Sequence, residues 1–119
     1  MKIAVPATGP EAIAAVDDRF GRAGFFVVYD TDTSAWENLV NSAGPQSAQG
    51  AGIQSAELLV RHGIGAVVTP HCGPKAFCVL RAAGIAVHLG IHKTVQEAVD
   101  AFLAGQLPAA SDADLAGHW

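Results

Sequence analysis

The order in which strand-like and helix-like segments follow one another most constrains the fold of this chain. Three short apolar, β-branched or aromatic runs typical of strands come first, at residues 2–6, 24–30 and 35–40. Helix-like and strand-like runs then alternate, at residues 51–62, 64–69, 74–83, 85–89 and 94–104. Thr94 and Glu97 form the capping-box pattern that opens the last of these helices. This order predicts a single α/β domain.

The connections predict how the strands pair. Turns and loops join the first three strands, which are expected to form an antiparallel meander, whereas helical crossovers make the last two strands parallel. We therefore expect one mixed five-stranded sheet flanked by three helices. Ligands of such sheets gather at the carboxyl ends of the parallel strands. The loops that reach this rim are residues 6–22, 70–74 and 89–93.

Composition limits the domain count and excludes several kinds of partner. The 119 residues are enough for one domain, which we expect at residues 1–107, followed by a loose tail at 108–119. A net charge of -4, with only seven Lys and Arg spread along the chain, argues against nucleic-acid binding. No apolar run approaches the ~20 residues of a membrane span, and the chain begins directly with a strand. A cytoplasmic protein with two free thiols is expected.

The segment at residues 69–76 (TPHCGPKA) carries the strongest chemical signal, because it joins a predicted strand to a predicted helix. Gly73 allows a tight turn, and Pro74 is favoured in a first helical turn. Cys72 therefore lies at or just before a helix N-terminus, whose partial positive charge favours the thiolate that binds soft metals. With His71 it forms a candidate metal-ligand pair. The alternative is a tight turn in which both residues are incidental.

Two further histidines are candidate ligands at the same edge of the sheet. His88 lies near the end of the last predicted strand, and His92 lies in the loop beyond it. Strand alternation allows His88 to face either layer, so a packed, hydrogen-bonded histidine is the alternative. For His92 the alternative is a solvated surface residue. Cys78, His62 and His118 are interpreted as partly exposed, structural and incidental, respectively.

The glycine-rich loop at residues 44–52 is a candidate anion cradle. Gly50 and Gly52 lie where the loop meets the following helix, whose first-turn N–H groups attract anions. The pattern is not a Walker motif, because no Gly-Lys-Ser/Thr follows it. An ordinary surface loop is the alternative.

Five blocks of the sequence form a recognisable set, namely residues 2–6 (KIAVP), 19–23 (RFGRA), 50–56 (GAGIQSA), 73–77 (GPKAF) and 83–85 (AGI). With these blocks in the same order, the chain resembles the dinitrogenase iron-molybdenum cofactor biosynthesis family, which includes NifX, the NafY core, the NifB C-terminal part and the orange protein. The resemblance covers roughly residues 1–107.

This resemblance implies a ribonuclease-H-like fold and a role in carrying or protecting an anionic metal–sulfur cluster. The implied cluster contains molybdenum with iron in the nitrogenase branch, and molybdenum with copper in the orange-protein branch, where it is held largely without covalent protein ligands. The His71-Cys72-Gly73-Pro74 form resembles members that accompany Mrp/MinD-type ATPases, which implies such an ATPase, or cofactor-assembly proteins, as partners.

One departure from the family concerns Arg19, which stands where many members have a histidine that is a favoured cofactor ligand. An arginine cannot be an imidazole ligand, but it attracts anions, as Arg22 also does. The alternative is that both are ordinary surface cations.

Together these features predict a non-catalytic carrier or scaffold for a metal–sulfur cluster. A two-metal hydrolase is disfavoured because the acidic residues lie in loops or at strand ends, with none in the first strand. A Cys72–His71 nucleophile pair is disfavoured because adjacent residues rarely point at one another. The remaining alternative is a metal-free adaptor that binds an ATPase.

Overall fold

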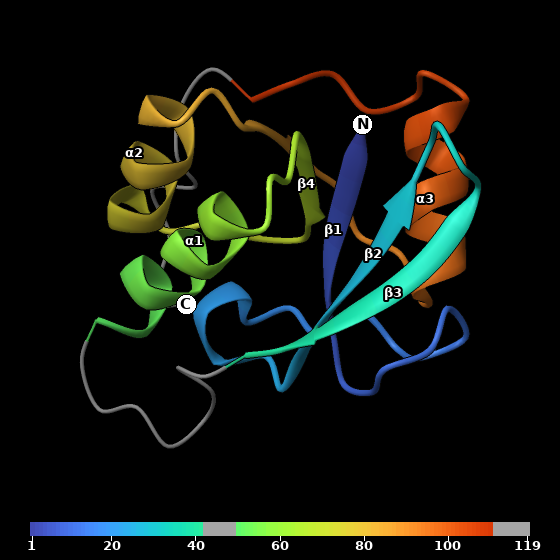
Figure 1. The fold of residues 1–119 in the computed structure, drawn as a ribbon, viewed down its shortest axis with the longest axis horizontal. Coiled ribbons are helices and arrows are strands. Elements are labelled where there is room, and N and C mark those ends of the chain that lie inside the picture. Colours follow the sequence, from blue (N-terminus) through green and yellow to red (C-terminus); the bar gives the residue numbers. More distant parts are fainter. Residues whose placement is uncertain (42–49, 111–119) are drawn as a thin grey trace.

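The computed structural model describes residues 1–41 and 50–110, which form one α/β domain (Figure 1). The strands are β1 (Lys2–Ala7), β2 (Phe25–Asp30), β3 (Ala35–Val40), β4 (Ala66–Thr69) and β5 (Ala86–Leu89). The helices are α1 (Ala51–Arg61), α2 (Pro74–Ala82) and α3 (Val95–Leu103), with a short 3₁₀ helix, η1 (Phe20–Arg22). Among the helices of this described part, none is long and apolar enough to cross a membrane.

The strands form one mixed sheet in the order β3-β2-β1-β4-β5. β1 pairs antiparallel with β2, and β2 antiparallel with β3, whereas β1–β4 and β4–β5 are parallel. This arrangement confirms the predicted meander and the predicted parallel pair. Because the crossovers bring β4 back beside β1, the first strand lies at the centre of the sheet.

Each α-helix ends in the same glycine motif, which also explains why β4 and β5 begin later than predicted. After α1, Gly63 has a φ of 68°, and the Ile64 N–H donates to the Leu59 carbonyl at 3.2 Å. After α2, Ile85 donates to the Leu80 carbonyl in the same way at 2.9 Å. These are Schellman bonds, so Ile64 and Ile85 are buried but belong to helix ends rather than to strands.

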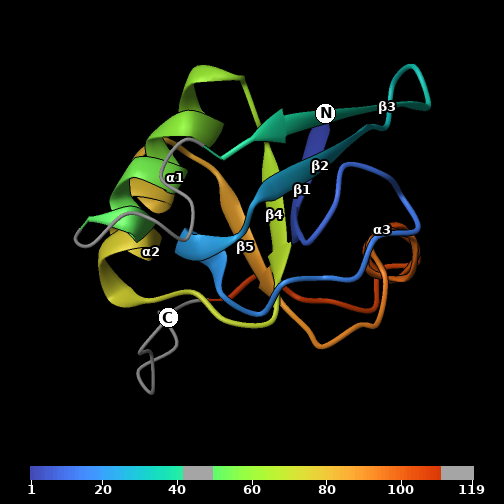
Figure 2. The same cartoon turned by 90° about the horizontal axis from the view of Figure 1, so that it is seen from below.

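The sheet separates two apolar layers (Figures 1 and 2). Helices α1 and α2 cover one face, where the buried residues include Phe26, Leu59 and Leu80. Helix α3 covers the other face and packs with alternate strand residues such as Ile3 and Val68. Burial on both faces is the reason that the central strands read as continuous apolar runs.

The start of α3 confirms the predicted helix signal. The Thr94 side chain accepts a hydrogen bond from the Glu97 N–H at 3.3 Å. The Glu97 carboxylate accepts in return from the Lys93 N–H at 3.3 Å, one residue earlier than in a standard capping box.

Residues 109–110, which were expected to belong to a loose tail, are attached to the edge of the sheet. Ala109 bridges to His88, and the Ala110 N–H donates to the Val87 carbonyl at 2.7 Å. An edge strand has unpaired backbone groups, which this short segment satisfies. The tail beyond it, with His118 and Trp119, lies outside the described residues.

Candidate functional site

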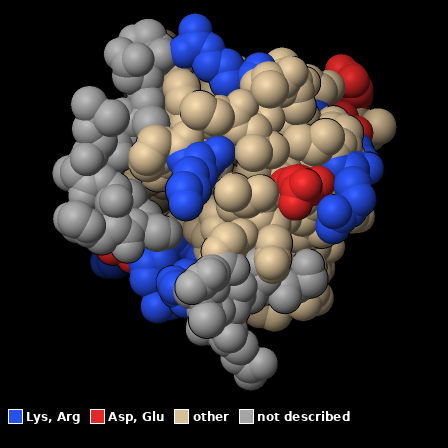
Figure 3. All heavy atoms as spheres, turned by 90° about the vertical axis from the view of Figure 1, so that its left-hand side faces the viewer, with Lys and Arg blue, Asp and Glu red and all other residues tan. Residues whose placement is uncertain are grey.

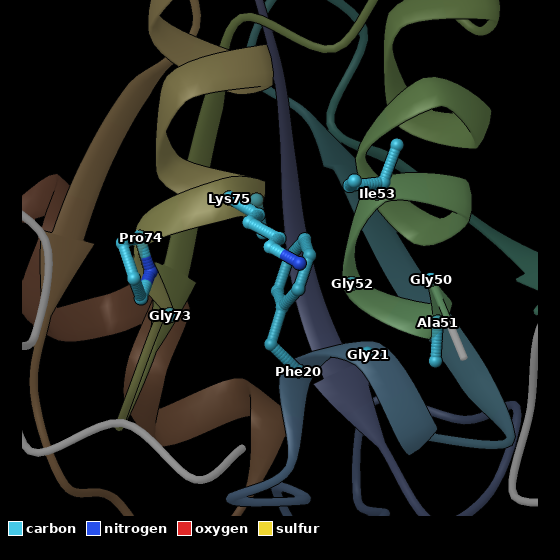
Figure 4. Close-up of a pocket in the computed structure, with 10 residues that line it drawn as sticks. Phe20, Gly21, Gly50, Ala51, Gly52, Ile53, Gly73, Pro74 and Lys75 are labelled. Atoms are coloured by element: carbon cyan, nitrogen blue, oxygen red, sulfur yellow. The ribbon is translucent and has the colours of Figure 1, made fainter. Parts of the chain in front are cut away.

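A pocket of about 320 Å³ lies where the first turns of α1 and α2 meet η1 (Figure 4). Because α2 follows β4, this is the carboxyl end of a parallel strand, where the topology predicts ligands. Its lining residues are Phe20, Gly21, Gly50, Ala51, Gly52, Ile53, Gly73, Pro74, Lys75 and Ala76.

The α2 wall of the pocket is a helix N-terminus without a side-chain cap. Gly73 is the N-cap residue, Pro74 follows it, and the first intrahelical bond runs from the Phe77 N–H to the Gly73 carbonyl at 3.0 Å. The N–H groups of Lys75 and Ala76 therefore have no partner within the helix. The first turn contains no acidic residue. Within the described part of the chain, its positive end is open to an anion.

The α1 wall repeats this arrangement. Gly50 is the N-cap residue in the left-handed conformation, with a φ of 71°, and it provides no side-chain cap. The first intrahelical bond runs from the Gln54 N–H to the Gly50 carbonyl at 2.9 Å, which leaves the N–H groups of residues 51–53 without a partner in the helix. This first turn also lacks an acidic residue. Two helix N-termini thus border one pocket.

Lys75 and Phe20 supply the charge and the apolar surface of the pocket. The exposed Lys75 side chain extends from the first turn of α2 toward the middle of the pocket, where the Phe20 ring lies (Figure 4). Phe20 is 1% exposed, and its ring packs against Phe26 with 5.2 Å between centroids. Among the described residues that line the pocket there is no Cys, His, Asp or Glu. Such a pocket suits a polarisable anion.

The wall formed by η1 depends on a close approach between two glycines. A Cβ atom on Gly21 would lie 2.7 Å from the backbone N of Gly52 and 2.8 Å from its Cα. Real side chains do not tolerate such distances, so η1 and α1 reach this separation only because residue 21 is glycine.

Three of the predicted site residues, Gly50, Gly52 and Gly73, line the pocket. Cys72 directly precedes the α2 N-cap, as predicted, but its side chain is 0% exposed and belongs to the core under α1 and α2. Its Sγ lies 3.8 Å from the Gly73 carbonyl oxygen. His71 is half-buried, and its carbonyl accepts a hydrogen bond from Thr69 Oγ1 at 2.9 Å. Both residues adjoin the pocket without lining it.

His88 and His92 lie elsewhere, on the α3 side of the sheet. His88 Nδ1 is 2.6 Å from the Leu107 carbonyl oxygen, and its ring meets the edge of Phe102 at 4.8 Å. Cys72 lies in the opposite apolar layer, under α1 and α2. The fold therefore separates Cys72 from His88, although both were predicted as ligands of one metal site. His92 packs beside Gly90, and its Nδ1 is buried without a hydrogen-bond partner.

The predicted anion-binding arginines lie at the two ends of η1, with Arg19 as its N-cap and Arg22 as its last residue. Arg19 is tied to Asp17, whose Oδ1 accepts from the Arg19 backbone N–H at 2.9 Å and from its Nε at 3.4 Å. Arg22 is half-buried at the end of η1. Neither arginine is among the residues that line the pocket. The two residues between them, Phe20 and Gly21, do line it.

The described residues contain no group of three or more His, Cys, Asp or Glu side chains placed to hold a metal ion. The recognition chemistry available at the pocket is therefore that of N–H donors, an ammonium group and an aromatic ring. Each of these acts on the outer surface of an anionic ligand.

Sequence reasoning missed the roles of Phe20, Gly21 and Lys75. The available signal was their position: Phe20 and Gly21 lie in one resemblance block, and Lys75 directly follows Gly73-Pro74 in another. Only the fold brings these two blocks together, because η1 and α2 are more than fifty residues apart in the chain.

Comparison with known proteins assigns the family. The family model described as dinitrogenase iron-molybdenum cofactor matches residues 1–105. The apo form of the orange protein from Desulfovibrio gigas is 46% identical, covers 95% of both chains and superposes with a TM-score of 0.90. A candidate NifB protein from Thermotoga is 34% identical over 98% of both chains, with a TM-score of 0.84. An uncharacterised protein of Methanocaldococcus jannaschii is 28% identical over 90% of this chain and 89% of its own. The chain therefore belongs to the dinitrogenase iron-molybdenum cofactor family.

Proposed function

We propose that this protein is a non-catalytic carrier that encloses an anionic metal–sulfur cluster in the pocket between α1, α2 and η1. The observation that carries the proposal is the convergence of two uncapped helix N-termini and Lys75 on one pocket whose described lining residues include no acidic side chain. Membership of a cofactor family supplies the class of cargo. The proposed cluster contains molybdenum with iron or copper and is stored or delivered for cofactor assembly in the cytoplasm.

The chemistry of a sulfide-rich cluster matches these groups. Cluster sulfur atoms accept N–H hydrogen bonds, and the anion is stabilised by each helix N-terminus by about 0.3–1 kcal/mol, reaching about 2 kcal/mol when partly buried. The ammonium group of Lys75 adds a charge-assisted contact, and the Phe20 ring excludes water from one side. Many weak contacts of this kind hold a cargo that can still be released.

Cys72 and His71 have a supporting role in this proposal. Cys72 is fully buried, so a bond from its sulfur to a metal requires the β4–α2 turn to open. In the closed turn the two residues shape the segment that presents the Gly73 end of α2. We therefore assign retention of the cluster to the backbone N–H groups and Lys75 rather than to a protein–metal bond.

The only protein partners that we propose for the carrier are cofactor-assembly proteins. None of the three matched proteins above is named as an ATPase or as the partner of one. An Mrp/MinD-type ATPase is consequently not part of the proposal.

Anaerobic reconstitution tests the proposed cargo. Wild-type protein would be incubated with tetrathiomolybdate plus iron or copper, desalted, and measured by visible absorption and elemental analysis. We expect a coloured protein with close to one cluster per chain. A protein that stays colourless and free of molybdenum under all these conditions would refute the carrier and favour a metal-free adaptor.

The variant Lys75→Glu connects the cargo to the pocket. Reversal of this charge should weaken tetrathiomolybdate binding by at least about 10-fold, because a carboxylate then faces the anion. Lys93→Glu is the matched control, since Lys93 is an exposed lysine next to α3 on the other face of the sheet. Equal weakening in both variants would show that binding follows overall charge and not this pocket.

A further inference from the structure

A buried polar cluster lies directly behind the pocket, in a region that is otherwise apolar. It consists of the side chains of Asn41 and Ser55 and the backbone carbonyls of Gly21 and Ala23. Ser55 is 0% exposed and Asn41 is 5% exposed. Both are therefore shielded from water, and their polar atoms depend on protein partners.

The hydrogen bonds of this cluster join its two side chains to each other, to η1 and to Ala23, the residue directly after η1. Ser55 Oγ lies 3.1 Å from the Gly21 carbonyl oxygen and 3.0 Å from Asn41 Oδ1. Asn41 Nδ2 donates to the Ala23 carbonyl at 2.8 Å and lies 3.4 Å from that of Gly21. The two side chains thus hold the backbone on both sides of Arg22.

Three separate elements are joined by these contacts. Asn41 directly follows β3, Ser55 is in the second turn of α1, and Gly21 is in η1. On its other side Gly21 is pressed against the Gly52 backbone, so close that a Cβ atom would not fit. The cluster therefore holds η1 close to the first turn of α1, which contains Gly52 and forms one wall of the pocket.

The choice of a serine at this place is informative. Serine is a poorer helix former than alanine, and burying its hydroxyl is unfavourable unless it is well hydrogen-bonded. Ala56, the next residue of α1, is also 0% exposed, but it belongs to the apolar core and not to this polar cluster. A hydrogen bond from Ser55 fixes both the direction and the distance of the Gly21 carbonyl, whereas apolar packing would not define its direction.

We infer that Asn41 and Ser55 are positioning residues that set the width of the pocket by holding η1 against the first turn of α1. This inference rests on the proposed function for its meaning, because the width matters only if the pocket holds an anion. The two residues do not touch the ligand. They fix the distance between the Phe20–Gly21 wall and the N–H groups of α1.

The test combines the variants Ser55→Ala and Asn41→Ala with tetrathiomolybdate as the probe. Each should weaken anion binding by about 10-fold, a typical effect of residues that orient binding groups. Because the two side chains contact each other and share the Gly21 carbonyl, the double variant should lose little more than either single one. Val99→Ala is the control for general destabilisation, since Val99 is 1% exposed and belongs to α3 in the other layer.

Amide chemical shifts of the ligand-free variants separate positioning from stability. Ser55→Ala should shift the NMR amide signals of Gly21, Ala51 and Gly52, whereas Val99→Ala should leave them in place. Unchanged signals together with wild-type affinity, or weakening no greater than in Val99→Ala, would overturn the inference. If wild-type protein binds no anion, the proposed function fails, and the ligand-free shifts still decide whether these residues position η1.

Discussion

At the level of single residues, two glycines three positions apart have different reasons to be glycine. A Cβ atom on Gly21 would overlap the backbone of Gly52, whereas one on Gly24 would meet nothing within 4 Å. Gly24 also has no positive φ, so its backbone is open to any residue. The steric requirement at this wall of the pocket is thus confined to residue 21.

The variant Gly21→Ala should lower the free energy of unfolding by about 1–3 kcal/mol, because η1 or α1 has to move to make room for the methyl group. Gly24→Ala should be neutral or stabilising by up to about 1 kcal/mol, since it restricts only the unfolded chain. Urea denaturation of both variants measures the difference. Equal stabilities would show that η1 yields without cost.

The two cysteines differ in burial and should differ in reactivity. Cys72 is fully buried, whereas Cys78 is exposed on α2. An alkylating reagent should therefore modify Cys78 about 100-fold faster or more, the ratio for an opening free energy of about 2.7 kcal/mol. Mass spectrometry of a labelling time course gives both rates. Comparable rates would indicate that the β4–α2 turn opens readily and would return Cys72 to the ligand candidates.

At the level of elements, the helix ends reveal which termini are left open. All three α-helices end at a glycine with positive φ, Gly63, Gly84 and Gly105. Their starts differ: α3 is capped by Thr94, while α1 and α2 begin at glycines without a side-chain cap. The two uncapped starts are those that border the pocket. A capping side chain there would occupy the same N–H groups as an anionic ligand.

The variant Gly73→Asp should therefore lose anion binding and gain stability against unfolding. Gly73 has an extended backbone and open space at its Cβ position, so an aspartate can cap α2 without strain. We expect a gain of about 0.5 kcal/mol in unfolding free energy together with loss of tetrathiomolybdate binding. Gly73→Asn, an uncharged cap, should weaken binding less. Undiminished binding by Gly73→Asp would exclude the α2 N-terminus as part of the site.

At the level of the whole molecule, four of the seven Lys and Arg residues belong to the layer of the sheet that contains the pocket. Helices α1, α2 and η1 carry Arg22, Arg61, Lys75 and Arg81 against one carboxylate, Glu57, in a chain with a net charge of -4. The surface formed by α1 and α2 shows several Lys and Arg side chains, with an acidic patch between two of them (Figure 3). This distribution attracts anions to one face of an acidic protein.

Anion binding should accordingly depend on salt. Between about 0.01 M and about 0.15 M salt the Debye length falls from ~30 Å to ~8 Å, and we expect tetrathiomolybdate affinity to fall about 3- to 10-fold. Lys75→Gln should show a shallower dependence, because one cation at the pocket is missing. Titrations at several salt concentrations measure both slopes. A flat wild-type response would mean that packing and not charge holds the anion.

Much of the fold follows from local sequence patterns. The alternation of apolar residues in strands, the capping box at Thr94 and the glycines after each helix are short-range signals, and they predicted the elements and the sheet. The strand β4 begins later than predicted because the Ile64 N–H donates to the Leu59 carbonyl at the end of α1. The apolar pattern of the sequence does not reveal this hydrogen bond. The attachment of Ala109 and Ala110 to β5 was missed for the same reason.

The sequence by itself determined the order of the elements, the mixed sheet and the family, since periodicity and motif blocks are readable along the chain. Only the tertiary structure decided which residues meet. It brought Phe20 and Gly21 to Lys75, buried Cys72 in the core and turned His88 to the opposite layer. Such outcomes depend on which face of a strand is covered and how closely two backbones approach. Neither quantity is encoded by any single segment, because both arise from packing between segments distant in the chain.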